Sequence, residues 1–359
     1  MNDEVSLCGE VIEALASWVS QQLQQHQWQC PKKLVLDPLG GDAGFRCYFR
    51  LNVQPGLLAV YAPPAVEKNH AFVALARHFI GQGVHAPEVV AVDFERGFLL
   101  LEDFGDRPLQ DELTSESVDM LYGEVLLSLL RLQQSPLPEP EPGFELPIYD
   151  AQLLRQEMQL FDQWFVPQLL DYELDSAERT MLNDFYDQLT QVALQQPQVC
   201  VHRDFHSRNL MYREGQAPGV IDFQDAVLGP VTYDLVSLLR DCYVRWPRAR
   251  VEQWALAYGT MVEDVGLVDD LCQQQWLQWF DWMGLQRHIK VLGIFARLWL
   301  RDGKSGYLND LPLVIRYTLE VADSYPELAG FADWFRRTLI PLCEQQPWYL
   351  DYQLAGEGS

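Results

Sequence analysis

The spacing of hydrophobic positions changes along the chain and divides it into a strand-rich part and a helical part. Residues 5–28 carry apolar side chains at intervals of three and four, which predicts an amphipathic helix. Short apolar or alternating runs, separated by Gly and Pro, then predict five strands, at residues 34–39, 45–53, 57–61, 89–93 and 98–102. One helix is expected among them, at residues 71–82.

From about Asp111 onward the pattern is almost entirely helical. The exception is residues 199–223, where two short apolar runs flank a polar loop. Residues 135–143 contain four prolines and predict a stiff loop between helices. We therefore expect an α+β protein with a small, sheet-rich N-terminal lobe at residues 1–105 and a larger helical C-terminal lobe at residues 106–359.

The composition of the chain indicates which classes of partner to exclude and in which cellular compartment to expect the protein. A formal net charge of −25 argues against nucleic acid, because phosphate backbones would be repelled. The chain has no basic segment followed by an apolar stretch at its start and no apolar run long enough for a membrane span, so neither a signal peptide nor a membrane partner is expected. Seven scattered cysteines without a C-x-x-C pair fit reduced thiols in the cytoplasm.

The residues with the clearest chemistry lie in the polar loop and just after it. His202, Asp204 and Asn209 follow an apolar run at spacings of two and five, and Asp222 ends a second apolar run. Phosphoryl transfer requires a base that orients the acceptor hydroxyl and oxygen ligands for Mg²⁺. A lone His-x-Asp would more often cap a turn, but the combination predicts Asp204 as catalytic base and Asn209 and Asp222 as Mg²⁺ ligands.

These residues also carry a resemblance to known enzymes. H-R-D-x-x-x-x-N followed by D-F resembles protein-kinase motifs, with Gln224 where the second motif has glycine. No A-P-E element follows, and G-V-I-D-F-Q-D-A-V-L-G-P resembles the aminoglycoside phosphotransferase/choline kinase branch of the kinase-like superfamily. With V-H-R-D-F-H-S-R-N-L-M and Y-D-L-V-S-L-L-R-D, it looks closer still to the bacterial anomeric kinases of N-acetylmuramate and N-acetylglucosamine. The resemblance extends from about Gly40 to Leu313.

The resemblance implies a fold, cofactors and an acceptor. The fold would be bilobal and protein-kinase-like, the cofactors ATP and Mg²⁺, and the reaction transfer of the γ-phosphate to the anomeric hydroxyl of an amino sugar in peptidoglycan recycling. His206, two residues after Asp204, lies where many kinases place a lysine that touches the transferred phosphate, although it could equally stabilise the turn. Asp234 resembles the family aspartate that braces the catalytic loop.

The phosphates of ATP are expected at a glycine-containing turn between the first two strands. Gly41 and Gly44 could bring backbone N–H groups close to phosphate oxygens, although such a turn is ordinarily a simple hairpin. The usual kinase lysine is missing, and the helix at residues 71–82 lacks the acidic residue that would pair with it. Arg46 and Arg50 are the candidate cations in its place, while Lys68 is expected to lie on the surface.

Two further predictions concern adenine and the acceptor. Glu102 ends the fifth strand, where an interlobe hinge would hydrogen-bond adenine, although a plain edge strand fits equally well. An aromatic run later in the chain consists of Trp276, Trp279, Phe280 and Trp282. Such a run usually belongs to the core, but it could also contact a sugar ring. If the substrate carries a carboxylate, Arg240 or Arg287 could bind it.

Two other functions remain open at this point. A kinase of another small alcohol, such as an aminoglycoside or choline, would suit the acidic composition, since both acceptors are cations. A non-catalytic nucleotide-binding protein would explain the missing lysine, but it would not explain the presence of the base together with both metal ligands. The sequence indicates neither an oligomeric state nor a choice between ATP and GTP.

Overall fold

The computed structural model describes residues 2–40 and 45–357, the side chains of residues 2–8 excepted. The described residues form two compact units, each with its own core. The first unit consists of the residues up to Leu132 together with Pro138–Leu146 and Arg208–Asp225, and the second consists of Gln133–Leu137, Pro147–Ser207 and the residues from Ala226 onward. The first unit therefore continues past the predicted boundary at residue 105 to Leu132 and also takes in two later segments that the predicted N-terminal lobe did not include.

The first unit is built on one antiparallel sheet with strand order β1-β2-β3-β5-β4. Its strands are β1 (Leu36–Leu39), β2 (Cys47–Leu51), β3 (Leu57–Tyr61), β4 (Val89–Asp93) and β5 (Phe98–Glu102). All five strands were predicted, and the last three have the predicted bounds. The first two are shorter than predicted, because the β1–β2 ladder pairs only Leu36–Leu39 with residues 48–51.

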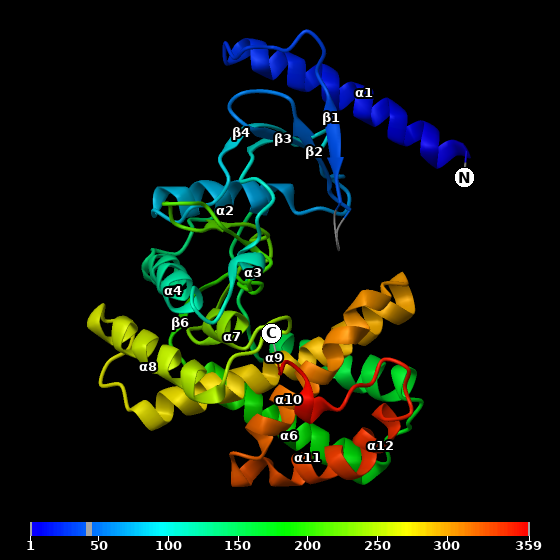
Figure 1. The fold of residues 1–359 in the computed structure, drawn as a ribbon, viewed down its shortest axis with the longest axis vertical. Helices are drawn as coiled ribbons and strands as arrows, with labels where there is room; N and C mark the ends of the chain where they lie inside the picture. Colours follow the sequence, from blue (N-terminus) through cyan, green and yellow to red (C-terminus); the bar gives the residue numbers. More distant parts are fainter. Residues whose placement is uncertain (1, 41–44, 358–359) are drawn as a thin grey trace. The chain divides into compact units, whose positions relative to one another are not determined.

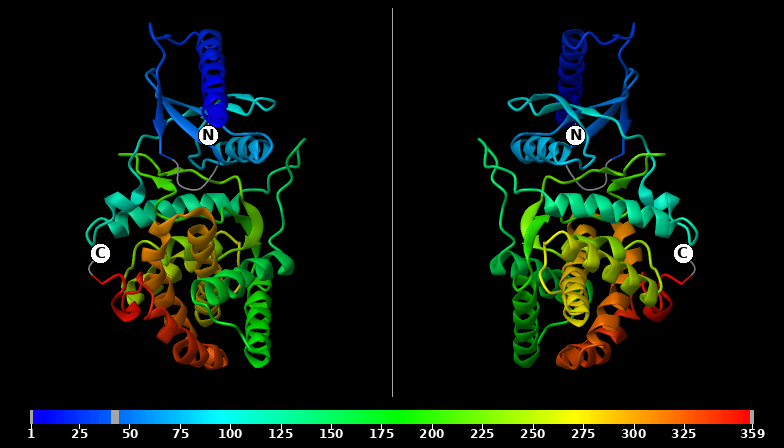
Figure 2. Two further views of the ribbon diagram at one scale, coloured as in Figure 1. Left: turned by 90° about the vertical axis from the view of Figure 1, so that its right-hand side faces the viewer. Right: turned by 90° about the vertical axis from the view of Figure 1, so that its left-hand side faces the viewer.

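Two helices lie on opposite faces of this sheet, α1 (Asn2–Gln25) and α2 (Asn69–Gly81), as Figures 1 and 2 show. Trp18 and its neighbours on α1 pack on Phe49, Leu51 and other sheet residues. Since side chains alternate along a strand, Tyr48 and Arg50 face away from α1. Helix α2 begins two residues before the predicted start, where the side-chain amide of Asn69 donates to the Ala62 carbonyl at 2.8 Å.

The later segments of the first unit bring a short hairpin to α2. The other helices and strands of this unit are α3 (Leu109–Glu112), α4 (Val118–Gln134) except its last two residues, β7 (Leu210–Met211) and β8 (Gly219–Val220). Phe223, just beyond β8, is fully buried. Its ring stacks on Phe72 of α2 with a centroid distance of 4.9 Å and meets the ring of Phe79 edge-on at 5.5 Å. Packing on α2 therefore fixes the residue that follows Asp222.

The second unit is helical, and α9 (Gln273–Asp302) runs through its core. A π-helical segment (Phe161–Leu169) and several helices pack around α9, so the apolar side chains of this unit form one continuous cluster. The helices of this unit are α5 (Ala151–Leu160), α6 (Ser176–Leu194), α7 (Tyr233–Leu239), α8 (Arg248–Asp264), α10 (Leu311–Ala322), α11 (Ala329–Trp334) and α12 (Ile340–Cys343).

One two-stranded sheet lies in this helical unit and holds the start of the polar loop. Strand β6 (Gln198–Val201) pairs antiparallel with β9 (Val227–Pro230). We predicted the first strand but not the second, because Gly229-Pro230 is typical of a turn. In the part of the chain that the structure describes, no helix has the length and apolar character needed to cross a membrane.

Candidate active site

A buried aspartate holds the loop that carries Asp204. Asp234, in the first turn of α7, accepts hydrogen bonds from the backbone N–H groups of His202 at 2.7 Å and Arg203 at 3.0 Å. Arg203 has φ +78°, in the left-handed region that costs a non-glycine residue ~1–3 kcal/mol. The two hydrogen bonds offset this strain, so Asp234 lies where the predicted brace of the loop should be.

Asp204 is partly buried among cationic groups of the second unit. Burial alone would raise the pKa of its carboxyl group, but Lys290, His206 and Arg203 outweigh this effect and lower the pKa. At neutral pH Asp204 is therefore ionised, and an ionised carboxylate can accept a hydrogen bond and a proton from a hydroxyl group.

The end of the same loop is held by a second buried aspartate. Asp241 accepts hydrogen bonds from the backbone N–H of Ser207 at 2.9 Å and from its hydroxyl at 2.5 Å. One residue earlier, the His206 ring meets the Tyr243 ring edge-on at 5.5 Å. These contacts position His206 beside an aromatic residue, while its predicted contact with the transferred phosphate stays a prediction.

The two predicted metal ligands lie together in the first unit. The Asn209 side-chain amide donates to Oδ2 of Asp222 at 3.3 Å, and Gln224 donates to Oδ1 of the same carboxylate at 2.8 Å. Asp222 is exposed and, like Arg203, has a positive φ, here +66°. An exposed carboxylate beside a carboxamide fits Mg²⁺, which prefers oxygen ligands and usually binds one or two carboxylates together with substrate phosphates. Gln224 therefore orients Asp222, a contact that we did not predict.

Arg46 forms an ion pair that the sequence analysis missed. Its Nε lies 3.2 Å from Oε2 of Glu67, and its guanidinium group lies 4.9 Å from the centre of the Phe72 ring. Glu67 precedes α2 by two residues and therefore lies outside the helix in which an acidic partner was expected. The Arg46 side chain is only 7% exposed, and its Nη2 is buried without a hydrogen-bond partner among the described residues. A buried donor of this kind favours a ligand that brings an acceptor.

The other two cations of this region are paired with carboxylates. Arg50 contacts both carboxylate oxygens of Asp103, at 2.6 and 3.1 Å, and so binds the segment that follows β5. Its predicted contact with the phosphates stays a prediction, and this ion pair would have to open to permit it. Lys68 lies on the surface as expected, with its side chain 60% exposed and 2.5 Å from Asp225.

The remaining nucleotide-site predictions concern Glu102 and two glycines. The backbone N–H of Glu102 donates to the Glu88 carbonyl at 3.0 Å, and its side chain lies 3.4 Å from Arg213. Any contact of Glu102 with adenine would therefore use its carbonyl oxygen or its carboxylate. Gly41 and Gly44 lie outside the described residues.

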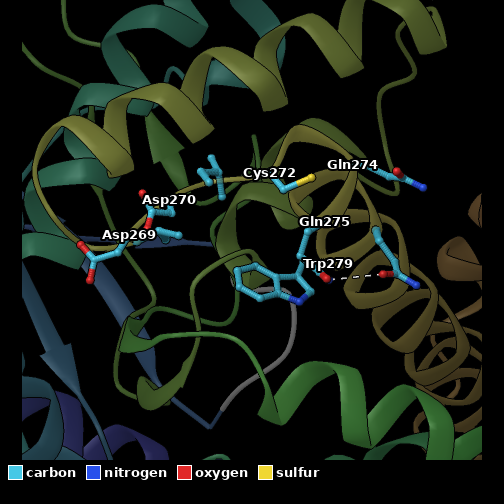
Figure 3. Close-up of a pocket in the computed structure, with 9 residues that line it drawn as sticks. Asp269, Asp270, Cys272, Gln274, Gln275 and Trp279 are labelled. Atoms are coloured by element: carbon cyan, nitrogen blue, oxygen red, sulfur yellow. Dashed lines mark hydrogen bonds between the residues drawn. The ribbon is translucent and has the colours of Figure 1, made fainter.

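The aromatic run on α9 is mostly core. Trp276, Phe280 and Trp282 are at most 5% exposed, while Trp279 is partly exposed and lines a pocket of about 350 Å³. Figure 3 shows the indole of Trp279 beside Gln275, with Asp269 and Asp270 on the segment that leads into α9. None of the predicted catalytic, nucleotide or metal residues lines this pocket.

Both arginines considered for a substrate carboxylate are buried in the second unit. Arg240 is 4% exposed and pairs with Asp281, and Arg287 is 5% exposed and donates to the Cys242 sulfur at 3.4 Å. Their burial argues against a direct contact with a substrate carboxylate.

Comparison with known proteins defines the class of this chain. The model of the phosphotransferase enzyme family matches residues 35–268. Solved structures agree in fold: a choline kinase from Cryptosporidium parvum has a TM-score of 0.59 at 12% identity and covers 90% of this chain and 99% of its own. An ADP-bound aminoglycoside phosphotransferase has a TM-score of 0.55 at 14% identity and covers 87% and 98%. The chain belongs to the phosphotransferase enzyme family, and the predicted α+β, kinase-like fold is confirmed.

Curated relatives are similar over most of the chain. A protein of Pseudomonas putida is 39% identical over 327 residues, which are 90% of this chain and 95% of that protein. Relatives from Pseudomonas aeruginosa and Neisseria meningitidis are 40% and 37% identical and cover 84% and 80% of this chain and 88% and 86% of their own. All three are named N-acetylmuramate/N-acetylglucosamine kinase. The predicted resemblance to this group is thus confirmed.

Proposed function

We propose that this chain is an ATP- and Mg²⁺-dependent kinase that phosphorylates N-acetylmuramate and N-acetylglucosamine at the anomeric hydroxyl, in the recycling of peptidoglycan. The proposal is carried by sequence identity of 37–40% to relatives of that name, over four fifths or more of this chain. The ionised Asp204 on its braced loop supports a catalytic function over that of a nucleotide-binding protein without activity. We also propose a cytoplasmic location, which the free thiols of the described cysteines support.

The residues divide the chemistry of phosphoryl transfer among them. Asp204 accepts a hydrogen bond from the anomeric hydroxyl, orients its oxygen toward the γ-phosphate and takes up the proton. Asn209 and Asp222 would hold Mg²⁺, and Gln224 keeps the Asp222 carboxylate in one orientation. When bound, Mg²⁺ neutralises negative charge on the phosphate oxygens. Arg46, oriented by Glu67, supplies positive charge where a lysine is absent.

Release of ADP with different acceptors tests this assignment. N-acetylmuramate and N-acetylglucosamine should support turnover, whereas their 1,5-anhydro derivatives, which lack the anomeric hydroxyl, should not. Choline and aminoglycosides are the comparison acceptors, because solved structures of similar fold include enzymes with these names. The phosphorylated product should no longer react as a reducing sugar, because its anomeric hydroxyl is blocked. Turnover with choline or an aminoglycoside but with neither sugar would contradict the proposal. If none of the acceptors supported turnover, a non-catalytic protein would be favoured.

Replacing Arg46 by alanine is expected to raise the KM for ATP and to lower kcat. The loss of one charge-assisted contact corresponds to a fall of roughly 10- to 150-fold in kcat/KM. Lys68→Ala is the matched control, because Lys68 is also a cation beside α2 but lies on the surface, paired with Asp225. Steady-state kinetics with ATP as the varied substrate measure both variants. A fully active Arg46→Ala together with a crippled Lys68→Ala would show that the predicted phosphate site is misplaced.

A further inference from the structure

A buried lysine on the central helix of the second unit contributes to the charge around Asp204, but no step of the proposed reaction has so far been assigned to it. Lys290 of α9 is 7% exposed, and lysine is almost never fully buried unless its charge is paired. Its ammonium nitrogen lies 3.0 Å from Oε1 of Glu157, on α5, and 3.0 Å from the hydroxyl of Tyr233, on α7. Three helices thus hold the ammonium group in one place.

The partner carboxylate of Lys290 also binds the catalytic loop. Glu157 is 7% exposed, and its Oε1 accepts a hydrogen bond from the guanidinium group of Arg203, the residue before Asp204. Its Oε2 accepts one from the hydroxyl of Tyr149. Glu157 therefore bridges two cations, and one of them belongs to the loop whose backbone Asp234 braces.

Stability alone is a weak reason for such a cluster. Desolvation of buried charges offsets much of their attraction, and apolar residues of similar volume often replace a buried ion pair without loss of stability. The cluster combines two cations with one carboxylate, so the positive charge exceeds the negative charge by one. Asp204 follows Arg203 directly in the chain and supplies a further negative charge at the end of this cluster of contacts. In keeping with this placement, Lys290 has the largest effect of the groups that lower the pKa of Asp204.

We propose that Lys290 is a positioning residue for phosphoryl transfer: Glu157 and Tyr233 hold its ammonium group inside the helical unit so that its positive charge acts on Asp204. The inference rests on the proposed function in one respect, namely that Asp204 orients the acceptor. Lys290 itself touches neither the acceptor nor the nucleotide in this scheme, and it acts only through the charge of the aspartate.

A test of this inference must separate the effect of Lys290 on the pKa of Asp204 from the effects of the other charged groups around that carboxylate. Charged and titratable groups act on it from the loop itself, from α7 and from α9; they are His202, Arg203, His206, Asp234, Arg287 and Lys290. Removal of a cation should raise the pKa of an aspartate, because the ionised form loses a favourable interaction. Removal of Glu157 should leave that pKa unchanged or lower it, since the two cations remain.

Direct titration of the Asp204 carboxyl group by carbon-13 NMR tests this inference, with Asp204→Asn to assign the signal. In Lys290→Met the group should titrate about one pH unit higher than in the wild-type protein. Glu157→Gln breaks the same ion pair without removing a cation, so the pKa of Asp204 in this variant should not rise. Lys290→Arg should restore the wild-type value, and Asp187→Asn, which breaks the exposed Arg155–Asp187 ion pair, is the control.

Two results would overturn the inference. One is an unchanged titration in Lys290→Met, and the other is an equal upward shift in Lys290→Met and Glu157→Gln, which would indicate only a damaged core. Thermal unfolding of each variant shows whether it folds, and Lys290→Arg keeps the charge if the methionine variant does not fold. The titration needs no acceptor, so it remains decisive even if the sugar assignment fails. Where turnover is measurable, the acid limb of kcat/KM should move with the titration.

Discussion

Replacing Asp204 by alanine is expected to lower turnover by about 100-fold or more, because a positioned base typically contributes that much to a proton transfer. Nucleotide binding should change little, since the expected function of Asp204 concerns the acceptor hydroxyl and not the phosphates. Single-turnover kinetics with the best acceptor measure the chemical step, and calorimetric titration with ADP and Mg²⁺ measures binding.

The appropriate control for Asp204 also removes one negative charge from the second unit. Glu252→Gln does so on α8, where Glu252 forms an i,i+4 ion pair with Arg248. This variant should keep wild-type turnover. If Asp204→Ala retained most of its turnover, Asp204 would not be the base. If it lost turnover and nucleotide affinity to the same extent, the loop itself would have been disturbed.

Replacing Asp222 by alanine is expected to weaken Mg²⁺-dependent nucleotide binding by about 100-fold or more, because loss of a residue that merely supports a metal ligand already costs about 10- to 100-fold. The variant loses the predicted charged ligand and leaves Asn209 and Gln224 without their shared acceptor. Asn209→Ala should cost less, because a carboxamide carries no charge. Titration of Mg²⁺ at a fixed concentration of ADP measures both effects.

Asp225→Asn is the matched control for the metal site. It removes a carboxylate three residues further along the chain, where Asp225 pairs with Lys68 on the surface. Its Mg²⁺ titration should follow the wild-type curve. Wild-type Mg²⁺ curves for both Asp222→Ala and Asn209→Ala would show that other residues hold the metal.

Local signals in the sequence were sufficient for the five strands of the first unit and for the position of the polar loop that carries Asp204. Glycine and proline mark the ends of β3, β4 and β5, so these strands have their predicted bounds. The spacing of Asp204, Asn209 and Asp222 identified a chemistry, and the structure brings Asn209 and Asp222 together. The assignment of these three residues to catalysis and metal binding stays a prediction.

Partners that are distant in sequence or outside the expected element could not be predicted in this way. Glu67 pairs with Arg46 from the segment before α2, not from within the helix. Glu157 and Lys290 lie on different helices, and only the packing of α5 on α9 brings them together. Periodicity indicates which face of a helix is buried, but it does not indicate which buried charge meets which.

The packing of Phe223 against two rings of α2 has a pharmacological consequence. Phe223 follows Asp222 directly, so a compound that separates its ring from those of Phe72 and Phe79 would also rotate the backbone that carries the carboxylate. Such an inhibitor would disable the predicted metal site without resembling a nucleotide or a sugar. Because Asp222 is predicted to hold the metal that binds with the nucleotide, the compound and ATP would weaken each other's binding, so its potency would fall as the ATP concentration rises. Resistance would nevertheless arise at residues of α2 rather than at the residues that contact the substrates.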